Sequence, residues 1–93
     1  MEELPSSPEI EKQVLGAMLL NKKACIIGVT NLTKDVFFHW RNRALFQAAV
    51  DLVNSGSPVD IISISEAAKK HVDKDSFDVD YVVDVSTSVG TST

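Results

Sequence analysis

The sequence is poor in the residue types that build disulfides and metal sites. It has one cysteine, Cys25, and two histidines, His39 and His71. A lone cysteine cannot form a disulfide within the chain, and no second cysteine or histidine pair stands at the spacing of zinc ligands. A disulfide scaffold and a zinc finger are therefore excluded, and we predict no metal site. The shortage of cysteine also fits a reducing, cytoplasmic compartment.

Motifs for catalysis and nucleotide binding are also missing. The chain contains four glycines, and none belongs to a G-x-x-x-x-G-K-[ST] phosphate-binding loop. Neither histidine neighbours a serine or cysteine in a recognised nucleophile motif. We therefore predict no catalytic and no cofactor-binding residue in this chain.

Long apolar runs and an excess of positive charge are absent as well. Glu2 and Glu3 stand where a signal peptide would carry basic residues, and no apolar run is long enough to span a bilayer. The net charge of −4 disfavours direct contact with a phosphate backbone. We expect neither a membrane nor nucleic acid among the direct partners of this chain.

The chain does have an ordinary apolar fraction, 44% of 93 residues, which is enough for one core. A domain of this size buries only about 60 to 65% of the surface that its unfolded chain exposes. Its stability should therefore be modest, which suits an interaction module better than a free-standing enzyme.

Helical periodicity covers residues 8–20. Ser6 and Ser7 before Pro8 form a helix-start signal. One apolar stripe follows, made of Ile10, Val14, Ala17 and Met18 and widened by Leu15 and Leu19. Gly16 interrupts the stripe, which suggests that another backbone packs closely there.

A second, shorter helix is predicted after Asn21, which can end the first. Its apolar positions are Ala24, Ile27 and Leu32. Thr33 then serves as the N-cap of a turn that delivers Phe37 and Phe38 to the core.

The strongest helical pattern spans residues 39–54. One face carries Phe38, Leu45, Ala49 and Leu52, with Phe46 and Val53 beside them, and the opposite face carries Arg43, Gln47, Asp51 and Asn54. Gly56 follows Ser55 and should end the helix, because glycine readily takes the left-handed conformation.

Two further helices complete the prediction. Ser63 and Glu66 form a capping box for a helix that continues to about Val72, and Asp60 is assigned to the preceding turn or to capping. Residues 79–85 are rich in valine and fit either a strand or a helix. Because no partner strand is evident, we favour a helix capped by Asp78, with Val79, Val82 and Val83 facing inward.

Together these elements predict an all-α fold, a compact orthogonal bundle of about five to six helices over residues 8–88. Residues 1–7 are expected to be a flexible lead. Residues 89–93 are expected to lead out of the domain.

Two residues in this bundle have both a structural and a functional interpretation. Asn42 lies between Phe38 and Leu45 on the apolar face, where an amide must find hydrogen-bond partners, so a structural bond to a nearby loop is favoured over a binding role. Cys25 is interpreted as a small buried hydrophobe more readily than as a reactive thiol.

Trp40 lies on the otherwise polar face of the same helix, next to Arg41 and Arg43. In one interpretation its ring folds back over the preceding helices from an irregular first turn. In the other, the three side chains form a contact for a partner or another subunit, because Trp and Arg are enriched at interface hot spots.

Four motifs in order resemble the N-terminal domain of the DnaB family of replicative DNA helicases. The first runs from Pro8 to Leu19 and includes Glu11 and Gly16; the second is Asp35 with Phe37 and Phe38. The third resembles [HN]-R-x-[IL]-F-x-A-[IV]-x-x-L and includes Asn42 and Phe46. The fourth resembles G-x-P-[IV]-D-x-[VI]-[TS]-[VL] and includes Gly56, Asp60 and Ser63.

The resemblance implies an assembly and docking domain that stabilises a hexameric ring helicase and binds primase and, in some systems, a loader. It also implies that a helical hairpin, a linker and an ATPase motor using ATP and magnesium follow residues 89–93. Two alternatives stay open: the related helicase-binding domain at the C-terminus of a primase, and an unrelated acidic adaptor module.

Overall fold

The computed structural model describes residues 8–73 and 77–88, which form five α-helices and one 3-10 helix with no strand among them. The helices are α1 (Pro8–Leu20), α2 (Lys22–Asn31), η1 (Lys34–Val36), α3 (Trp40–Asn54), α4 (Ile61–Ala68) and α5 (Val79–Thr87). The all-α prediction is therefore confirmed. The predicted lead of residues 1–7, the Ser6–Ser7 cap and the exit of residues 89–93 lie outside the described residues.

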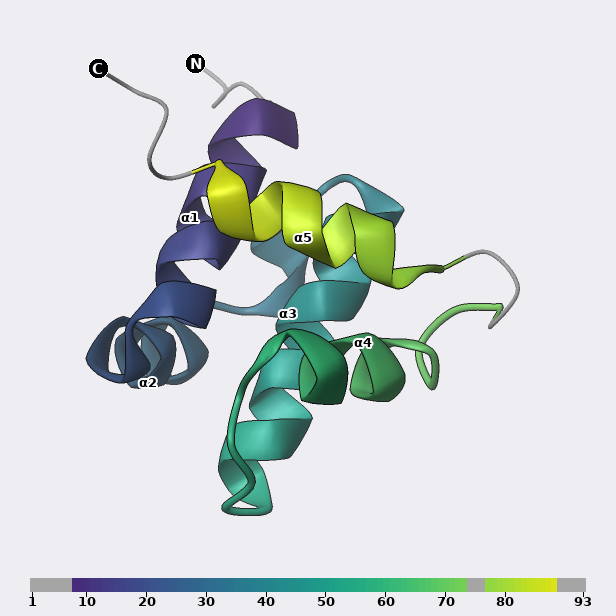
Figure 1. The fold of residues 1–93 in the computed structure, drawn as a ribbon. Coiled ribbons are helices and arrows are strands. Elements are labelled where there is room, and N and C mark those ends of the chain that lie inside the picture. Colours follow the sequence, from purple (N-terminus) through teal and green to yellow (C-terminus); the bar gives the residue numbers. More distant parts are fainter. Residues whose placement is uncertain (1–7, 74–76, 89–93) are drawn as a thin grey trace.

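Helix α3 lies at the centre of the bundle (Figure 1). It packs against α1, α2 and α4, and α5 packs across α1 and α4. Its apolar residues are buried around much of its circumference, since Ala44 and Ala48 are inaccessible as well as Leu45, Phe46 and Ala49. The C-terminal stop is as predicted, because Gly56 has a φ of +73°.

The buried face of α1 differs from the predicted stripe. Leu15 and Met18 are buried, whereas Ile10 and Val14 are 54% and 37% exposed. Glu11 lies one turn before Leu15 on the buried side and is only 7% exposed. The prediction is confirmed for Leu15 and Met18 and wrong for Ile10 and Val14, because it followed the apolar residues alone, whereas the face that meets the bundle contains a carboxylate. Gly16 is also buried.

Helix α2 begins where Asn21 accepts a hydrogen bond from the backbone N–H of Ala24 at 3.0 Å. The predicted apolar position Ile27 is 54% exposed, and Cys25 and Gly28 face the core instead. Gly28 permits a close approach to α1, because a Cβ there would lie 2.8 Å from Sδ of Met18.

The segment before α3 separates two adjacent phenylalanines. Phe37 is 1% exposed and stacks on Phe46, with ring centroids 5.1 Å apart. Phe38 is 72% exposed, so its predicted burial is wrong. The backbone is extended at Phe37, and extended residues project their side chains alternately to opposite sides. Thr33 precedes η1 but makes no side-chain cap bond.

Helix α4 is capped by Asp60, which is one of the two roles predicted for that residue, and not by the predicted Ser63–Glu66 capping box. Asp60 is the N-cap, and its carboxylate accepts the backbone N–H of Ser63 at 2.8 Å. Ser63 is thus inside the helix, and Glu66 pairs with Lys69 at 3.5 Å instead of closing a capping box. The helix ends at Ala68, four residues before the predicted end at Val72.

Helix α5 confirms the choice of helix over strand. Asp78 caps it by accepting the backbone N–H of Tyr81 at 3.2 Å. Val82 and Val85 are fully buried, but Val79 and Val83 are 40% and 44% exposed, so their predicted inward orientation is wrong. Because the four valines lie on both faces of the helix, their spacing alone did not show which face would be buried.

Candidate functional site

A buried carboxylate holds the start of α3 in place. Glu11 Oε2 on α1 accepts the backbone N–H of Phe38 at 2.7 Å. Its Oε1 accepts the backbone N–H of His39 at 3.3 Å and the side-chain amide of Asn42 at 2.9 Å. Hydrogen bonds to an ionised acceptor are stronger than neutral ones, so this carboxylate fixes the conformation of the segment from Phe38 to Asn42.

The amide of Asn42 extends this network to a third helix. Asn42 is fully buried, and its Oδ1 accepts a hydrogen bond from the phenol of Tyr81 on α5. Its structural interpretation is therefore favoured, although its partners come from α1 and α5 and not from a loop. Every buried side-chain N or O atom among the described residues has a hydrogen-bond partner.

Tyr81 is kept protonated by its surroundings. Burial is the largest cause and raises the pKa of its phenol to about 12, while the nearby Arg41 lowers it and Asp84 raises it further. The phenol therefore keeps its proton, and can donate the hydrogen bond to Asn42, to a higher pH than an ordinary tyrosine would.

An aromatic surface lies outside this buried network. Its members, Phe38, His39, Trp40, Arg41 and Tyr81, are called the aromatic–arginine surface below. The His39 ring stacks between its neighbours, with centroids 6.2 Å from Trp40 and 6.3 Å from Tyr81. The Arg41 guanidinium lies 4.7 Å from the Trp40 ring centroid and 5.4 Å from that of Tyr81. Cation–π contacts to two rings hold the guanidinium in one orientation.

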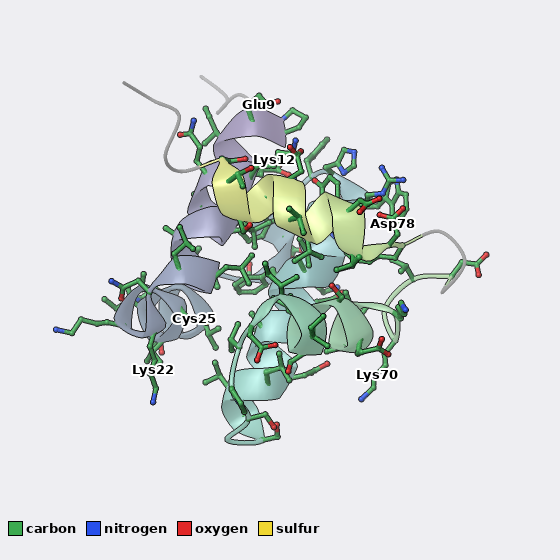
Figure 2. All side chains as sticks on the ribbon, viewed as in Figure 1. Glu9, Lys12, Lys22, Cys25, Lys70 and Asp78 are labelled. Atoms are coloured by element: carbon green, nitrogen blue, oxygen red, sulfur yellow. The ribbon has the colours of Figure 1, made fainter. Side chains whose placement is uncertain are left out.

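Arg41 has no carboxylate within ion-pair distance among residues 8–73 and 77–88. Lys12, which also approaches the Tyr81 ring, differs because it forms an ion pair with Asp84 at 2.5 Å. Figure 2 shows Lys12 where α1 meets α5. The positive charge of Arg41 therefore remains available to an external acidic group.

The predicted contact residues are only partly brought together. Trp40 is 45% exposed and touches Arg41, so its ring is not part of the core. Arg43 points its Nε–H to the backbone carbonyl of Phe37 at 3.1 Å. Arg43 thus contacts the backbone of the loop before α3 and not the Trp40 ring, whereas Phe38, two residues before Trp40, is exposed.

Sequence reasoning named Glu11 as a motif residue but did not predict its hydrogen bonds, and it did not single out Tyr81. A signal for Glu11 was present, since it stands four and seven residues before Leu15 and Met18, the spacing of one helix face. Nothing comparable marks Tyr81, whose partner Asn42 lies 39 residues away.

The site contains no arrangement suited to covalent or metal chemistry. No group of three or more His, Cys, Asp or Glu side chains that could hold a metal occurs in the described part of the chain. Cys25 is 2% exposed, and burial raises the pKa of its thiol, as expected of a packing residue. None of the helices in the described ranges is long and apolar enough to cross a membrane.

The described residues form a helical bundle that presents the aromatic–arginine surface at the start of α3. Residues 3–93 match the family model described as DnaB-like helicase N terminal domain, and the chain belongs to this family. The fold agrees, because the crystal structure of the N-terminal domain of DnaB helicase from Mycobacterium tuberculosis superimposes with a TM-score of 0.81 at 23% identity. That match covers 96% of this chain and 62% of the other.

Similar sequences are replicative helicases by name. The Bacillus subtilis (strain 168) replicative DNA helicase DnaC is 29% identical over 95% of this chain and 20% of its own length. The Treponema pallidum (strain Nichols) replicative DNA helicase DnaB is 36% identical over 67% of this chain and 14% of its own. This chain therefore spans about a fifth or less of the length of these relatives.

Proposed function

We propose that this chain is the N-terminal assembly and partner-docking domain of a replicative DNA helicase. The rest of that protein unwinds duplex DNA with ATP and magnesium held by a motor domain outside these residues. The N-terminal domain stabilises a hexameric ring of identical subunits and docks primase, and in some systems a helicase loader. The family match and the replicative-helicase relatives support this proposal.

The aromatic–arginine surface is the observation that carries the docking role. Phe38 and Trp40 are 72% and 45% exposed, and a partner that covers these rings would gain the favourable free energy of removing apolar surface from water. The backbone beneath them is fixed by Glu11, so little conformational entropy is lost on binding. Trp, Tyr and Arg are the residue types that dominate interface hot spots.

The docking role is tested by titrating this chain with the C-terminal domain of the cognate primase. Trp40→Ala and Arg41→Glu are each expected to weaken binding by about 2 kcal/mol, or about 30-fold, as hot-spot residues do. Ile62→Ala is the matched control, because Ile62 is 68% exposed and belongs to α4, which contributes no residue to this surface. Binding that both surface variants leave unchanged would place the primase site elsewhere, and no binding at all would remove primase as the partner.

The assembly role needs the whole helicase. Deleting this domain should raise the subunit concentration below which the hexamer dissociates, which sedimentation velocity measures. Rings that persist equally well without the domain would contradict a stabilising role.

A further inference from the structure

A second candidate surface lies at the other end of α1. A cavity of about 510 Å³ opens between the end of α1, the first turns of α2 and the loop after α3. Most of its wall is apolar and includes Met18, Leu19, Val53, Pro58 and Val59. Met18 can adapt to different occupants, because its thioether side chain is flexible and polarisable.

Exposed apolar side chains continue this surface beyond the cavity. Leu20 and Ile26 line its rim, and they are 63% and 44% exposed. An enclosed small-molecule site would bury such residues around its ligand. An apolar strip that runs from a cavity onto the open surface fits the face of a helix better than a small ligand.

The charge at the rim is opposite to that of the whole chain. Lys22 lines the cavity and Lys23 follows it, whereas none of the described residues lining the cavity is acidic and the chain carries a net charge of −4. Both lysines stand in the first turn of α2, which has no acidic residue. The partial positive charge of a helix N-terminus disfavours lysine there, so these residues do not stabilise α2.

We propose that this groove binds an amphipathic helix of a protein partner, with apolar residues in the cavity and carboxylates facing Lys22 and Lys23. The apolar wall supplies the burial and the two lysines select acidic flanks. The proposal is independent of primase docking, because the groove is at the C-terminal end of α1 and the aromatic–arginine surface is held near its N-terminal end.

Cys25 provides a reporter for occupancy of the groove. It lines the cavity, it is the only cysteine in the chain, and Figure 2 shows it on α2 close to Lys22. Its thiol is 2% exposed and reacts only when a reagent enters from the cavity side or the helix opens. A helix seated in the groove should therefore slow the reaction of Cys25 with a thiol reagent.

The probe is a synthetic helix with leucines at positions i, i+3, i+4 and i+7 and glutamates on both flanks of that face. We expect saturable binding by calorimetry together with slower Cys25 labelling. Lys22→Glu should weaken the affinity by about fivefold, the size of an exposed ion-pair effect. Lys70→Glu should leave the affinity unchanged, because Lys70 lies beyond α4 on the far side of the molecule in Figure 2.

A second pair of variants tests the apolar half of the proposal. Leu20→Ser should weaken binding and Ile62→Ser should not, although both residues are highly exposed and neither substitution opens the core. Equal binding of a peptide with lysines in place of the glutamates would overturn the charge selection. Protection of Cys25 by a long-chain fatty acid but not by the acidic helix would assign the groove to a lipid and overturn the proposal.

Discussion

Glu11 and Phe38 are 27 residues apart in the chain, yet the carboxylate of one accepts the backbone N–H of the other at 2.7 Å. The carboxylate is buried and the phenyl ring it positions is the most exposed large apolar side chain in the described ranges. The hydrogen bonds of the buried Glu11 carboxylate thus hold an exposed aromatic segment in place. The same carboxylate also accepts hydrogen bonds from the backbone N–H of His39 and the side chain of Asn42, so it fixes both the segment before α3 and the first turn of α3.

Replacing Glu11 by glutamine should lower the free energy of unfolding by about 2 kcal/mol, because an amide offers one acceptor oxygen to three donors and adds unpaired N–H groups. Urea unfolding measures the change. Hydrogen exchange at the amides of Phe38 and His39 should also become faster. Glu66→Gln is the control, since the Glu66 side chain is 70% exposed, and should change stability by less than about 0.5 kcal/mol. Equal effects of the two substitutions would contradict the role assigned to Glu11.

Tyr81 should make the stability of the domain fall at alkaline pH. The unfolded phenol ionises near 10.0 and the folded one near 12, so the folded state holds its proton more tightly. The contribution is fully present below pH 10 and is lost as the pH rises from 10 to 12. The difference in the free energy of unfolding between the wild type and Tyr81→Phe, followed by urea unfolding across this pH range, isolates the contribution of the Tyr81 phenol.

At neutral pH, Tyr81→Phe should cost about 1 kcal/mol, because it leaves Oδ1 of Asn42 buried without its donor. A double-mutant cycle with Asn42→Ala should show coupling of similar size. Additive effects would mean that the two side chains do not depend on each other.

The sequence predicted the helical fold because each helix carries its own local signals. Asp78 and Gly56 mark a start and a stop through backbone chemistry that a single residue controls. Asp60 and Ser63 compete for the same role three residues apart, and only the observed bond from the Ser63 N–H to Asp60 decides between them. Local patterns therefore fix the presence of a helix better than its first residue.

The candidate surface was harder to predict because it depends on contacts between distant segments. Phe38 was assigned to the core as an aromatic beside Phe37, and its exposure results from the extended backbone that Glu11 holds. Trp40 and Arg41 are adjacent in sequence, so their contact could be anticipated. The approach of Tyr81 from α5 could not, since it requires the packing of α5 across the bundle.

Asp60→Ala should lower the melting temperature more than Ser63→Ala, because only the aspartate accepts the hydrogen bond that starts α4. Hydrogen bonds from the backbone of Ser63 lower the pKa of Asp60 below its ordinary value of 3.8. The cap is therefore fully formed above pH 3.8 and is lost as the pH falls through the lower folded value. The difference in melting temperature between the wild type and Asp60→Ala should therefore become smaller at acidic pH. A larger decrease in melting temperature for Ser63→Ala would indicate that Ser63, and not Asp60, caps α4.

Trp40 is the only tryptophan in the chain, so its fluorescence reports on the aromatic–arginine surface alone. Because 45% of the residue is accessible, emission in the free domain should be red-shifted and acrylamide should quench it readily. Arg41→Ala should raise the quenching constant, because the guanidinium covers one face of the ring at 4.7 Å. The increase in the quenching constant should not exceed about twofold, because nearly half of Trp40 is already exposed. Lys70→Ala is the control and should leave the constant unchanged. Blue-shifted emission that acrylamide cannot reach, together with unfolding of Trp40→Ala, would place the ring in the core and move the docking surface elsewhere.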